Sequence, residues 1–337
     1  QSGDYIRLEE TALFDPGNPT VIDAKDATFE GLTGIEMSAD ELFATEDKMF
    51  HFPDDPTLGL FDISELFVVQ GESIQLAVNA AGALGGAQEV VVGAGTFGGS
   101  VEVWVDDLTM IGTGETTIID TDQIDAFANN GDRDTGFELT TSSDDATGVH
   151  VDNVTIDGFS FAGAGNGTTG ILLGEGFRQA DDTTIQNSFF DGLSDGIAAR
   201  RLDDGLTISN VRMRNISEQG IDIRTSLGSD EVVLIEDSNI VSDGEAVLFD
   251  GSVNGSEITI ASNRLRSRDA DAVRFADNVR CASVEMTDNR IVGDDEGIDF
   301  DGNVTASLVD ISGNRSIEGG DDGIAVDGSI LLLSQFR

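Results

Sequence analysis

A few arginines and aspartates near the middle of the chain have the residue types that acid–base chemistry on an acidic sugar requires. They are Arg200, Arg201, Asp203, Asp204, Asp222 and Arg224. An arginine beside a carboxylate can bind the carboxylate of a uronic acid, and a neighbouring carboxylate can remove a proton from that sugar. Arg200, Arg201, Asp222 and Arg224 are therefore the candidate catalytic residues. The alternative, which we prefer, is a set of charge pairs on a solvated face.

A second set of candidate ligands consists of carboxylates that stand just before a glycine or alanine at regular intervals. Its members are Asp195, Asp243, Glu245, Asp271, Asp294, Asp295, Asp321 and Asp322. If they stack at one corner of a repeating coil, neighbouring carboxylates lie about 5 Å apart and repel one another. Oxygen ligands of this kind suit Ca²⁺, which we predict as the cofactor. Solvation in high salt is the alternative, because the spacing matches neither an EF-hand loop nor a glycine-rich nonapeptide array.

Many of these residues belong to a strand that recurs eight times between Thr135 and Val326. Each copy reads polar residue, Gly or Ala, apolar residue, any residue, apolar residue. The steps between successive copies are 34, 26, 24, 26, 26, 25 and 26 residues. A fixed period in this range is typical of a solenoid. The copies start at Thr135, Thr169, Asp195, Gln219, Glu245, Asp271, Glu296 and Asp322.

Two further families of short apolar strands alternate with the first, one around 154–156 and its repeats, the other around Phe190, Ile240 and their repeats. Short strands with a period of two, two or three to a coil of about 25 residues, predict an all-β fold, a right-handed parallel β-helix. We assign residues 71–337 to this β-helix, with a capping helix near 73–82. Residues 1–70 show no period and hold all four prolines, so we predict an irregular extension that serves in assembly or as a linker.

The third and fifth residues of each copy are predicted to face the core and to stack on their counterparts one coil away. The fourth residue faces outward, and this column mixes charged with apolar residues. Asp222 and Asp299 in it stand three coils apart, too far for the acid–base pair of a glycosidase. The asparagines after the second strand are predicted to take left-handed turn conformations and to stack as an amide ladder. They are Asn187, Asn210, Asn263, Asn289 and Asn314.

The composition restricts the partners of this chain. A formal charge of −46 argues against nucleic acid and anionic lipid, because both bind cationic surfaces. The same charge suits cation binding or a saline, marine or halophilic environment, where salt screens self-repulsion. The apolar runs are too short for membrane insertion, and Cys281 is the only cysteine, so no disulfide framework is present. We therefore expect an extracellular or cell-surface location.

Residues 73–120 resemble the opening of the pectin-lyase-like right-handed parallel β-helix superfamily. The segments that carry this resemblance are Ser73-Ile74-Gln75, Val92-Gly93-Ala94-Gly95, Leu108-Thr109-Met110-Ile111-Gly112 and Ile118-Ile119-Asp120. The resemblance implies that the helix caps the N-terminal end of the apolar core. It implies no particular activity, because the superfamily contains lyases, hydrolases, esterases and epimerases as well as tailspikes and adhesins. The histidines His51 and His150 do not stand in the Gly-His-Gly context of its polygalacturonases.

We interpret the chain as a non-enzymatic extracellular structural or adhesive β-helix that self-assembles end to end. The missing catalytic motifs, the mixed outward column and the single Trp and Tyr favour this interpretation. The expected partners are further copies of the chain or other cell-surface components, with carbohydrate as one candidate. The alternative is a polysaccharide lyase, hydrolase or epimerase that acts on an acidic glycan.

Overall fold

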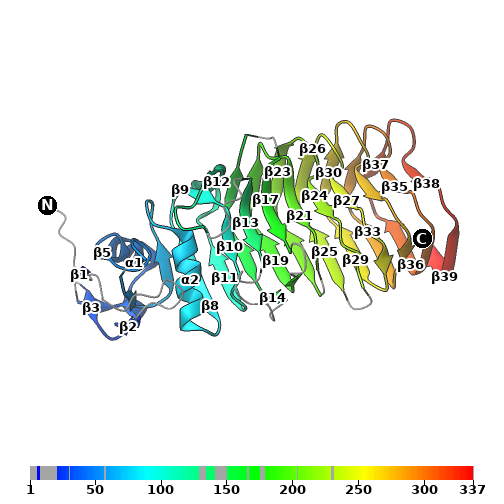
Figure 1. Cartoon of the computed structure of the whole chain (residues 1–337). Helices are drawn as coiled ribbons and strands as arrows, with labels where there is room; N and C mark the ends of the chain where they lie inside the picture. The colour runs from blue at the N-terminus through cyan, green and yellow to red at the C-terminus, as the bar shows by residue number, and fades with distance from the viewer. Residues whose placement is uncertain are drawn as a thin grey trace.

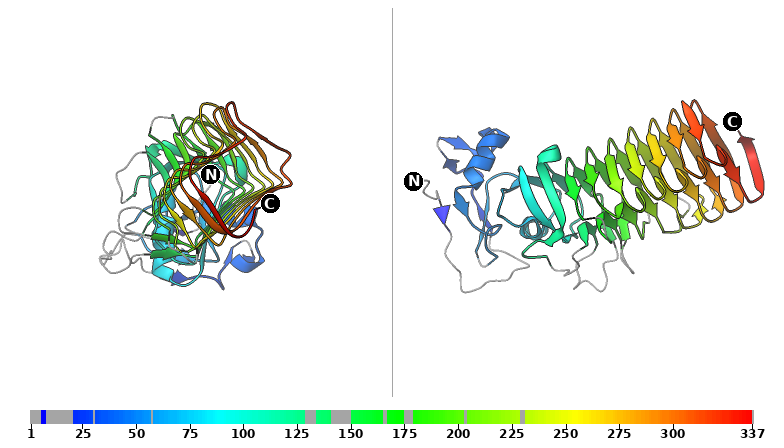
Figure 2. Two further views of the ribbon diagram at one scale, coloured as in Figure 1. Left: turned by 90° about the vertical axis from the view of Figure 1, so that its right-hand side faces the viewer. Right: turned by 90° about the horizontal axis from the view of Figure 1, so that it is seen from above.

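The structure, a computed structural model, describes residues 6–7, 21–29, 31–56, 58–128, 134–140, 150–164, 167–174, 179–202, 204–228 and 231–336. The chain forms an elongated parallel β-helix with a small N-terminal unit at one end (Figure 1). Seen along its axis, the coils superpose around one central core (Figure 2). The predicted all-β fold is confirmed. No helix among the described residues is both long and apolar enough to cross a membrane.

Three parallel sheets run the length of the β-helix. Sheet A contains the strand repeat that the sequence revealed, preceded by one strand that stands outside the repeat. Its strands are β10 (Val101–Val103), β13 (Thr135–Leu139), β17 (Thr169–Leu173), β21 (Asp195–Ala199), β24 (Ile221–Ile223), β27 (Val247–Phe249), β31 (Val273–Phe275), β35 (Ile298–Phe300) and β38 (Ile324–Val326).

Sheet B contains the second strand family. Its strands are β7 (Leu66–Val68), β8 (Gln88–Val92), β11 (Leu108–Ile111), β15 (Thr155–Asp157), β19 (Thr183–Gln186), β22 (Leu206–Ser209), β25 (Val232–Glu236), β29 (Glu257–Ala261), β33 (Ser283–Thr287) and β36 (Val304–Ser312), joined by β28 (Val253–Asn254), β32 (Val279–Arg280) and β39 (Ile330–Phe336).

Sheet C contains the third family. Its strands are β9 (Gly95–Gly99), β12 (Thr117–Ile124), β16 (Ser160–Ala162), β20 (Phe189–Asp191), β23 (Arg212–Ile216), β26 (Asn239–Ser242), β30 (Arg264–Ser267), β34 (Arg290–Val292) and β37 (Ser316–Glu318).

The core is the predicted stack of inward side chains. In sheet A, Val101 pairs with Phe137, which pairs with Ile171, and the column continues in register to Ile324. Aromatic rings form ladders inside it, and the Phe275 ring lies 4.6 Å from that of Phe249 and 4.8 Å from that of Phe300. Such stacking of rings adds to the free energy gained by burying them.

In the first coils, close approach between neighbouring coils requires the glycine in the second position of the repeat, whereas Ala246 and Ala272 hold this position in two later coils. A Cβ on Gly136 would lie 2.4 Å from the backbone oxygen of Gly170, and one on Gly170 would lie 2.6 Å from that of Gly196. Real Cβ atoms do not come so close to backbone, so a side chain here would force neighbouring coils apart. The residue therefore sets the tight stacking of sheet A.

The predicted capping helix is α2 (Ile74–Leu84), which closes the N-terminal end of the core. Ser73 caps it, because its hydroxyl accepts the N–H of Leu76, and Gly85 ends it with a φ of 69°. Asp125, from the following coil, accepts the hydroxyl of Ser73 at 2.5 Å and the N–H of Ile74 at 3.0 Å. These bonds fix the helix on the first coils.

The stretch before residue 70, predicted to be irregular, contains short regular elements. They are β1 (Ile6–Arg7), β2 (Val21–Asp23), β3 (Thr28–Phe29), β4 (Leu32–Thr33), α1 (Ala39–Glu46), β5 (Met49–Phe50) and β6 (Leu60–Asp62). Its own small core includes Phe29, Leu42, Met49 and Phe61. A capping box of Ser38 and Glu41 begins α1, a signal that the sequence did carry. The strand β7 already belongs to sheet B.

The turn prediction is right for two asparagines and wrong for three. Asn187 and Asn210 have φ values of 52° and 50°, and the amide of Asn210 donates to Asn187 at 2.7 Å. In the later coils Ser262, Asp288 and Gly313 take the left-handed position instead. Asn263, Asn289 and Asn314 follow them, and each accepts a backbone N–H one coil earlier, at 2.8–2.9 Å. These three asparagines form a ladder along successive coils, and Asn263 and Asn289 are buried.

Candidate functional site

Of the predicted catalytic residues, Asp222 stands on strand β24 of sheet A, and the three arginines follow strands β21 and β24. Asp222 is fully buried, and its Oδ2 accepts the Nε–H of Arg224 at 2.5 Å. Burial raises the pKa of Asp222 to about 6 against the opposing effects of Arg224 and Arg200, and the carboxylate of Asp195 raises it further. Adjacent coils therefore do bring part of the predicted set together.

The other predicted residues add no further side-chain hydrogen bond to Asp222 among the described residues. The backbone N–H groups of Arg200 and Arg201 both donate to the carbonyl oxygen of Leu173, at 2.9 and 3.2 Å. Asp203 lies outside the described residues, and Asp204 is exposed. The second oxygen of Asp222, Oδ1, has no hydrogen-bond partner. The group is thus an ion pair of Asp222 and Arg224 with further charges around it.

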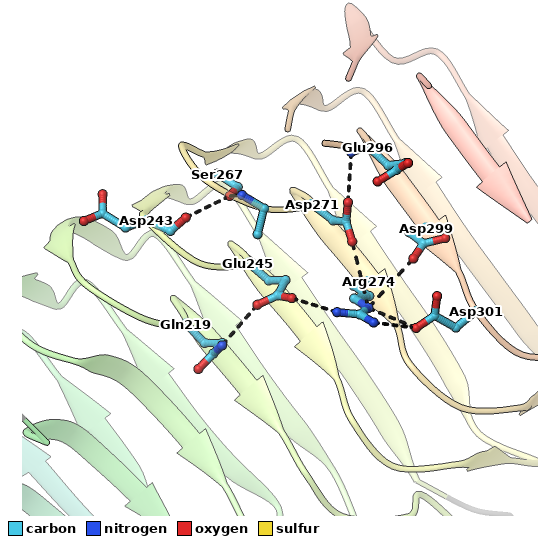
Figure 3. Close-up of polar contacts among 10 residues, drawn as sticks. Gln219, Asp243, Glu245, Ser267, Asp271, Arg274, Glu296, Asp299 and Asp301 are labelled. Atoms are coloured by element: carbon cyan, nitrogen blue, oxygen red, sulfur yellow. Dashed lines mark hydrogen bonds and ion pairs between the residues drawn. The ribbon is translucent and has the colours of Figure 1, made fainter. Parts of the chain in front are cut away.

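Arg274 is the centre of a cluster of carboxylates on sheet A (Figure 3). Its Nη2 and Nε donate to Asp301 Oδ2 at 2.7 and 3.1 Å, and its Nη1 donates to Glu245 Oε1 at 3.3 Å. The Oδ2 atoms of Asp299 and Asp271 lie 3.8 and 3.9 Å from Nε. One guanidinium therefore neutralises part of four carboxylates. We call Glu245, Asp271, Arg274, Glu296, Asp299 and Asp301 the Arg274 cluster.

The Arg274 cluster holds more carboxylates than one arginine can balance. A hydrogen bond with the Asp271 carboxyl, together with burial and nearby carboxylates, raises the pKa of Glu296 to about 7. Burial and a hydrogen bond with Asp301 raise the pKa of Asp299 to about 7. Near neutral pH each of these two carboxyl groups is therefore partly protonated. Active sites and structural ion-pair networks both contain groups of this kind. The register places Leu248 and Arg274 between Asp222 and Asp299, so those two aspartates are three strands apart, as predicted.

Arginines neutralise three of the eight predicted calcium ligands. Glu245 and Asp271 contact Arg274, and Asp243 Oδ1 lies 2.9 Å from Arg268 Nη1. Asp195 is buried, whereas Asp294, Asp295, Asp321 and Asp322 are exposed. Within the part of the chain that the structure describes, no three acidic, histidine or cysteine side chains are grouped to hold a metal ion. The calcium site stays a prediction.

Sequence reasoning missed a second charged surface, on the outer face of sheet C. Six of the sixteen arginines follow its strands: Arg212, Arg214, Arg264, Arg266, Arg290 and Arg315. We call these residues the arginine stripe. All six side chains are exposed. The pairs Arg212-x-Arg214 and Arg264-x-Arg266 were the available signal, because alternate residues of a strand face the same side.

Polar cavities lie beside the arginine stripe, along the corner between sheets B and C. The larger has a volume of about 620 Å³ and is lined by Asp237, Ser238, Asn239, Ser262, Asn263, Arg264, Asp288, Arg290 and Arg315. A second, of about 340 Å³, shares Asp237 and Asn239 with the first and extends to Phe189 and Arg212. Because they share these two residues, the two cavities form one polar strip along several coils.

Comparisons with known proteins bear on the fold alone. No family model and no curated protein matches the chain. Two similar solved structures are the A-modules of the Azotobacter vinelandii mannuronan C-5 epimerases AlgE4 and AlgE6. The first is 14% identical over 78% of this chain and 94% of that one, with a TM-score of 0.34. The second is 12% identical over 77% and 94%, with a TM-score of 0.32. Values this low support no argument about activity.

Proposed function

We propose that the protein is a non-enzymatic extracellular β-helix with a structural or adhesive role. The observation that carries this proposal is the engagement of Arg274. All three of its nitrogens contact carboxylates of the same chain, so a substrate carboxylate would have to displace Asp301 or Glu245. A displaced carboxylate would then lose its partner while still largely buried, which is costly.

Burial of the acids supports the same conclusion. Asp222 is 0% exposed, and Asp299 and Glu245 are each 7% exposed. A general acid or base must come within hydrogen-bond reach of the reacting atoms of its substrate. A polysaccharide cannot approach a carboxylate that is closed off in this way. The charges on sheet A are better suited to holding coils together.

A continuous stack of coils also suits a structural role. One apolar core runs from Phe52 near the N-terminal cap to Val309 in the last coils. Stacked coils of this kind form a stiff rod with long, flat faces that can bind an extended partner. The charge of −46 fits a saline extracellular setting, and that location is part of the proposal.

Self-association is the second part of the proposal. Ile330 and Leu331 on β39 are 47% and 60% exposed, and β39 pairs with β36 along one edge only among the described strands. Exposed apolar residues on a strand edge favour pairing with another chain. Sedimentation velocity in high NaCl tests this, with Leu331→Lys against the control Val232→Lys, which changes an exposed apolar residue on β25 in the middle of the rod. Assembly that both variants retain would refute end-to-end pairing.

The second candidate function is a lyase, hydrolase or epimerase for an acidic glycan. It is favoured by Glu296 and Asp299, whose pKa values near 7 suit an acid or base that works at neutral pH. The test incubates the protein with alginate, polygalacturonate and sulfated glycans. Reducing ends and unsaturated uronates report cleavage, and NMR after incubation in D₂O reports exchange at C5. Any of these signals, if lost in Asp299→Asn, would overturn the non-enzymatic proposal.

A further inference from the structure

We propose that the arginine stripe binds an anionic polysaccharide whose sugars carry carboxylate or sulfate groups. This inference rests on the proposed adhesive function and names the partner for it. The stripe concentrates positive charge on one face of a chain whose formal charge is −46. Arg224 and Arg274 on sheet A are, by contrast, paired with carboxylates of the same chain.

Four arginines of the stripe are free to bind a partner. Within the described parts of the chain, Arg264, Arg266, Arg290 and Arg315 have neither an ion pair nor a side-chain hydrogen bond. Arg214 pairs with Asp191 at 2.7 Å, and Arg212 lies 3.7 Å from Glu115. A guanidinium offers a planar fork of donors that matches a carboxylate or a sulfate, so free arginines in a row favour a partner with repeated anionic groups.

The sheet sets the spacing of the guanidinium groups. Arg264 pairs in register with Arg290, so their backbones are about 4.8 Å apart. Asn239 separates Arg264 from Arg212 on the other side. A strand spacing of this size is comparable with the length of one sugar unit in an extended polysaccharide. Arginines on successive or alternate strands can therefore meet charges on successive or alternate sugars.

The lining of the larger cavity favours a sugar over a polyphosphate. Asp237 and Asp288 line it together with Arg264 and Arg290. Their carboxylates can accept hydrogen bonds from sugar hydroxyls, whereas the phosphate groups of a nucleic acid offer them no donor. The Oδ1 atom of Asn239, which lines both cavities, is buried and lacks a hydrogen-bond partner.

The surface is already ordered for binding. The guanidinium of Arg214 lies 4.7 Å from the centre of the Phe189 ring, and that of Arg212 lies 6.0 Å from it. This cation–π contact holds both arginines on the sheet face. The other arginines stand on β30 and β34 or next to β37, whose backbones are fixed in the stack. The fixed backbone positions, together with the two side chains held on Phe189, reduce the entropy lost on binding.

The test measures binding of polygalacturonate and chondroitin sulfate by biolayer interferometry, with neutral dextran and single-stranded DNA for comparison. The double variant Arg264→Gln/Arg290→Gln is compared with Arg280→Gln, which removes an exposed arginine from β32 of sheet B. We expect both anionic glycans to bind, with affinity falling as NaCl rises. The double variant should lose about tenfold or more in affinity. Arg280→Gln should bind as the unaltered protein does, and circular dichroism should show both variants folded.

Several outcomes would overturn the inference while the proposed function stands. Equal binding of dextran would show that charge does not select the partner. Equal loss in Arg280→Gln would show that only overall charge matters, and tighter binding of DNA than of either glycan would point to the wrong class of polymer. The proposed function fails on a different signal, namely product release or C5 exchange in the glycan panel.

Discussion

Asp301 and Arg274 form an ion pair of two hydrogen bonds beside sheet A, because Oδ2 of Asp301 accepts both Nη2–H at 2.7 Å and Nε–H at 3.1 Å. Asp301 follows the strand that pairs with the strand of Arg274, so the contact joins two coils. It also orients the guanidinium toward Glu245, which lies one coil earlier on the other side. A single arginine thus connects three coils.

Replacing Arg274 by Gln is predicted to destabilise the β-helix. Four carboxylates lose the one cation that they share among the described residues, and their mutual repulsion then opposes folding. Arg274 is 37% exposed, so solvent screening limits the loss to about 1–2 kcal/mol in the free energy of unfolding. Urea unfolding at neutral pH measures it. Arg280→Gln is the matched control, and an equal loss in that variant would contradict the role given to the cluster.

Stability is predicted to fall as pH rises from about 4 to about 7. The pKa values of Asp299 and Glu296 rise from ordinary values of 3.8 and 4.5 to about 7 on folding. Over this range the folded chain binds more protons than the unfolded chain, so the free energy of unfolding decreases as pH rises. The stabilisation that these two carboxyl groups provide is fully present below their unfolded pKa values and is lost as pH rises through 7. The buried Asp222, with a pKa of about 6, acts in the same direction.

Asp299→Asn tests the origin of this pH dependence. The amide has the shape of the protonated acid but does not titrate, so the decline in melting temperature between pH 4 and pH 7 should be shallower in the variant. Asp204→Asn, at an exposed position outside the cluster, is the control and should keep the slope of the unaltered protein. If the unaltered protein instead gains stability with pH, the proton sharing inferred for the cluster is wrong.

The core of the β-helix could be predicted from the sequence because each inward residue repeats its environment. An apolar residue at the third repeat position always meets its counterpart one coil away, from Phe137 to Ile324. Period and alternation therefore determine the register of sheet A. The capping helix was recognisable for a similar reason, since Ile74, Ala77, Val78 and Ala81 mark one buried face.

The charged contacts could not be predicted in the same way. Asp301 stands outside the five-residue repeat, and only its three-dimensional position shows that it pairs with Arg274. The repeat predicted that Glu245 and Asp271 stack in an acidic column. It did not predict that Arg274, in the fourth repeat position, contacts both of them. Long side chains such as that of arginine can reach several positions, so their partners do not follow from the repeat.

Phe275→Ala is predicted to be among the most destabilising core substitutions. The ring is 1% exposed and stacks between Phe249 and Phe300. Its removal leaves a cavity between two rings that the rigid sheet cannot close, and the expected loss is about 3–5 kcal/mol. Phe275→Leu keeps most of the volume and should lose clearly less. Equal unfolding midpoints for the two variants in urea would show that the stack itself contributes little.

Salt and calcium are predicted to affect stability in separable ways. With a charge of −46, the folded chain repels itself, so NaCl should raise the melting temperature by screening. The calcium hypothesis requires a further rise in CaCl₂ at the same ionic strength, reversed by chelator, because a bound ion stabilises only the folded state. Asp294 and Asp295 are two of the exposed predicted ligands that no arginine contacts among the described residues, so Asp294→Asn/Asp295→Asn should abolish that further rise. A melting temperature that follows ionic strength alone, whichever cation is present, would reject the calcium site and leave arginine as the counter-charge of the acidic corner.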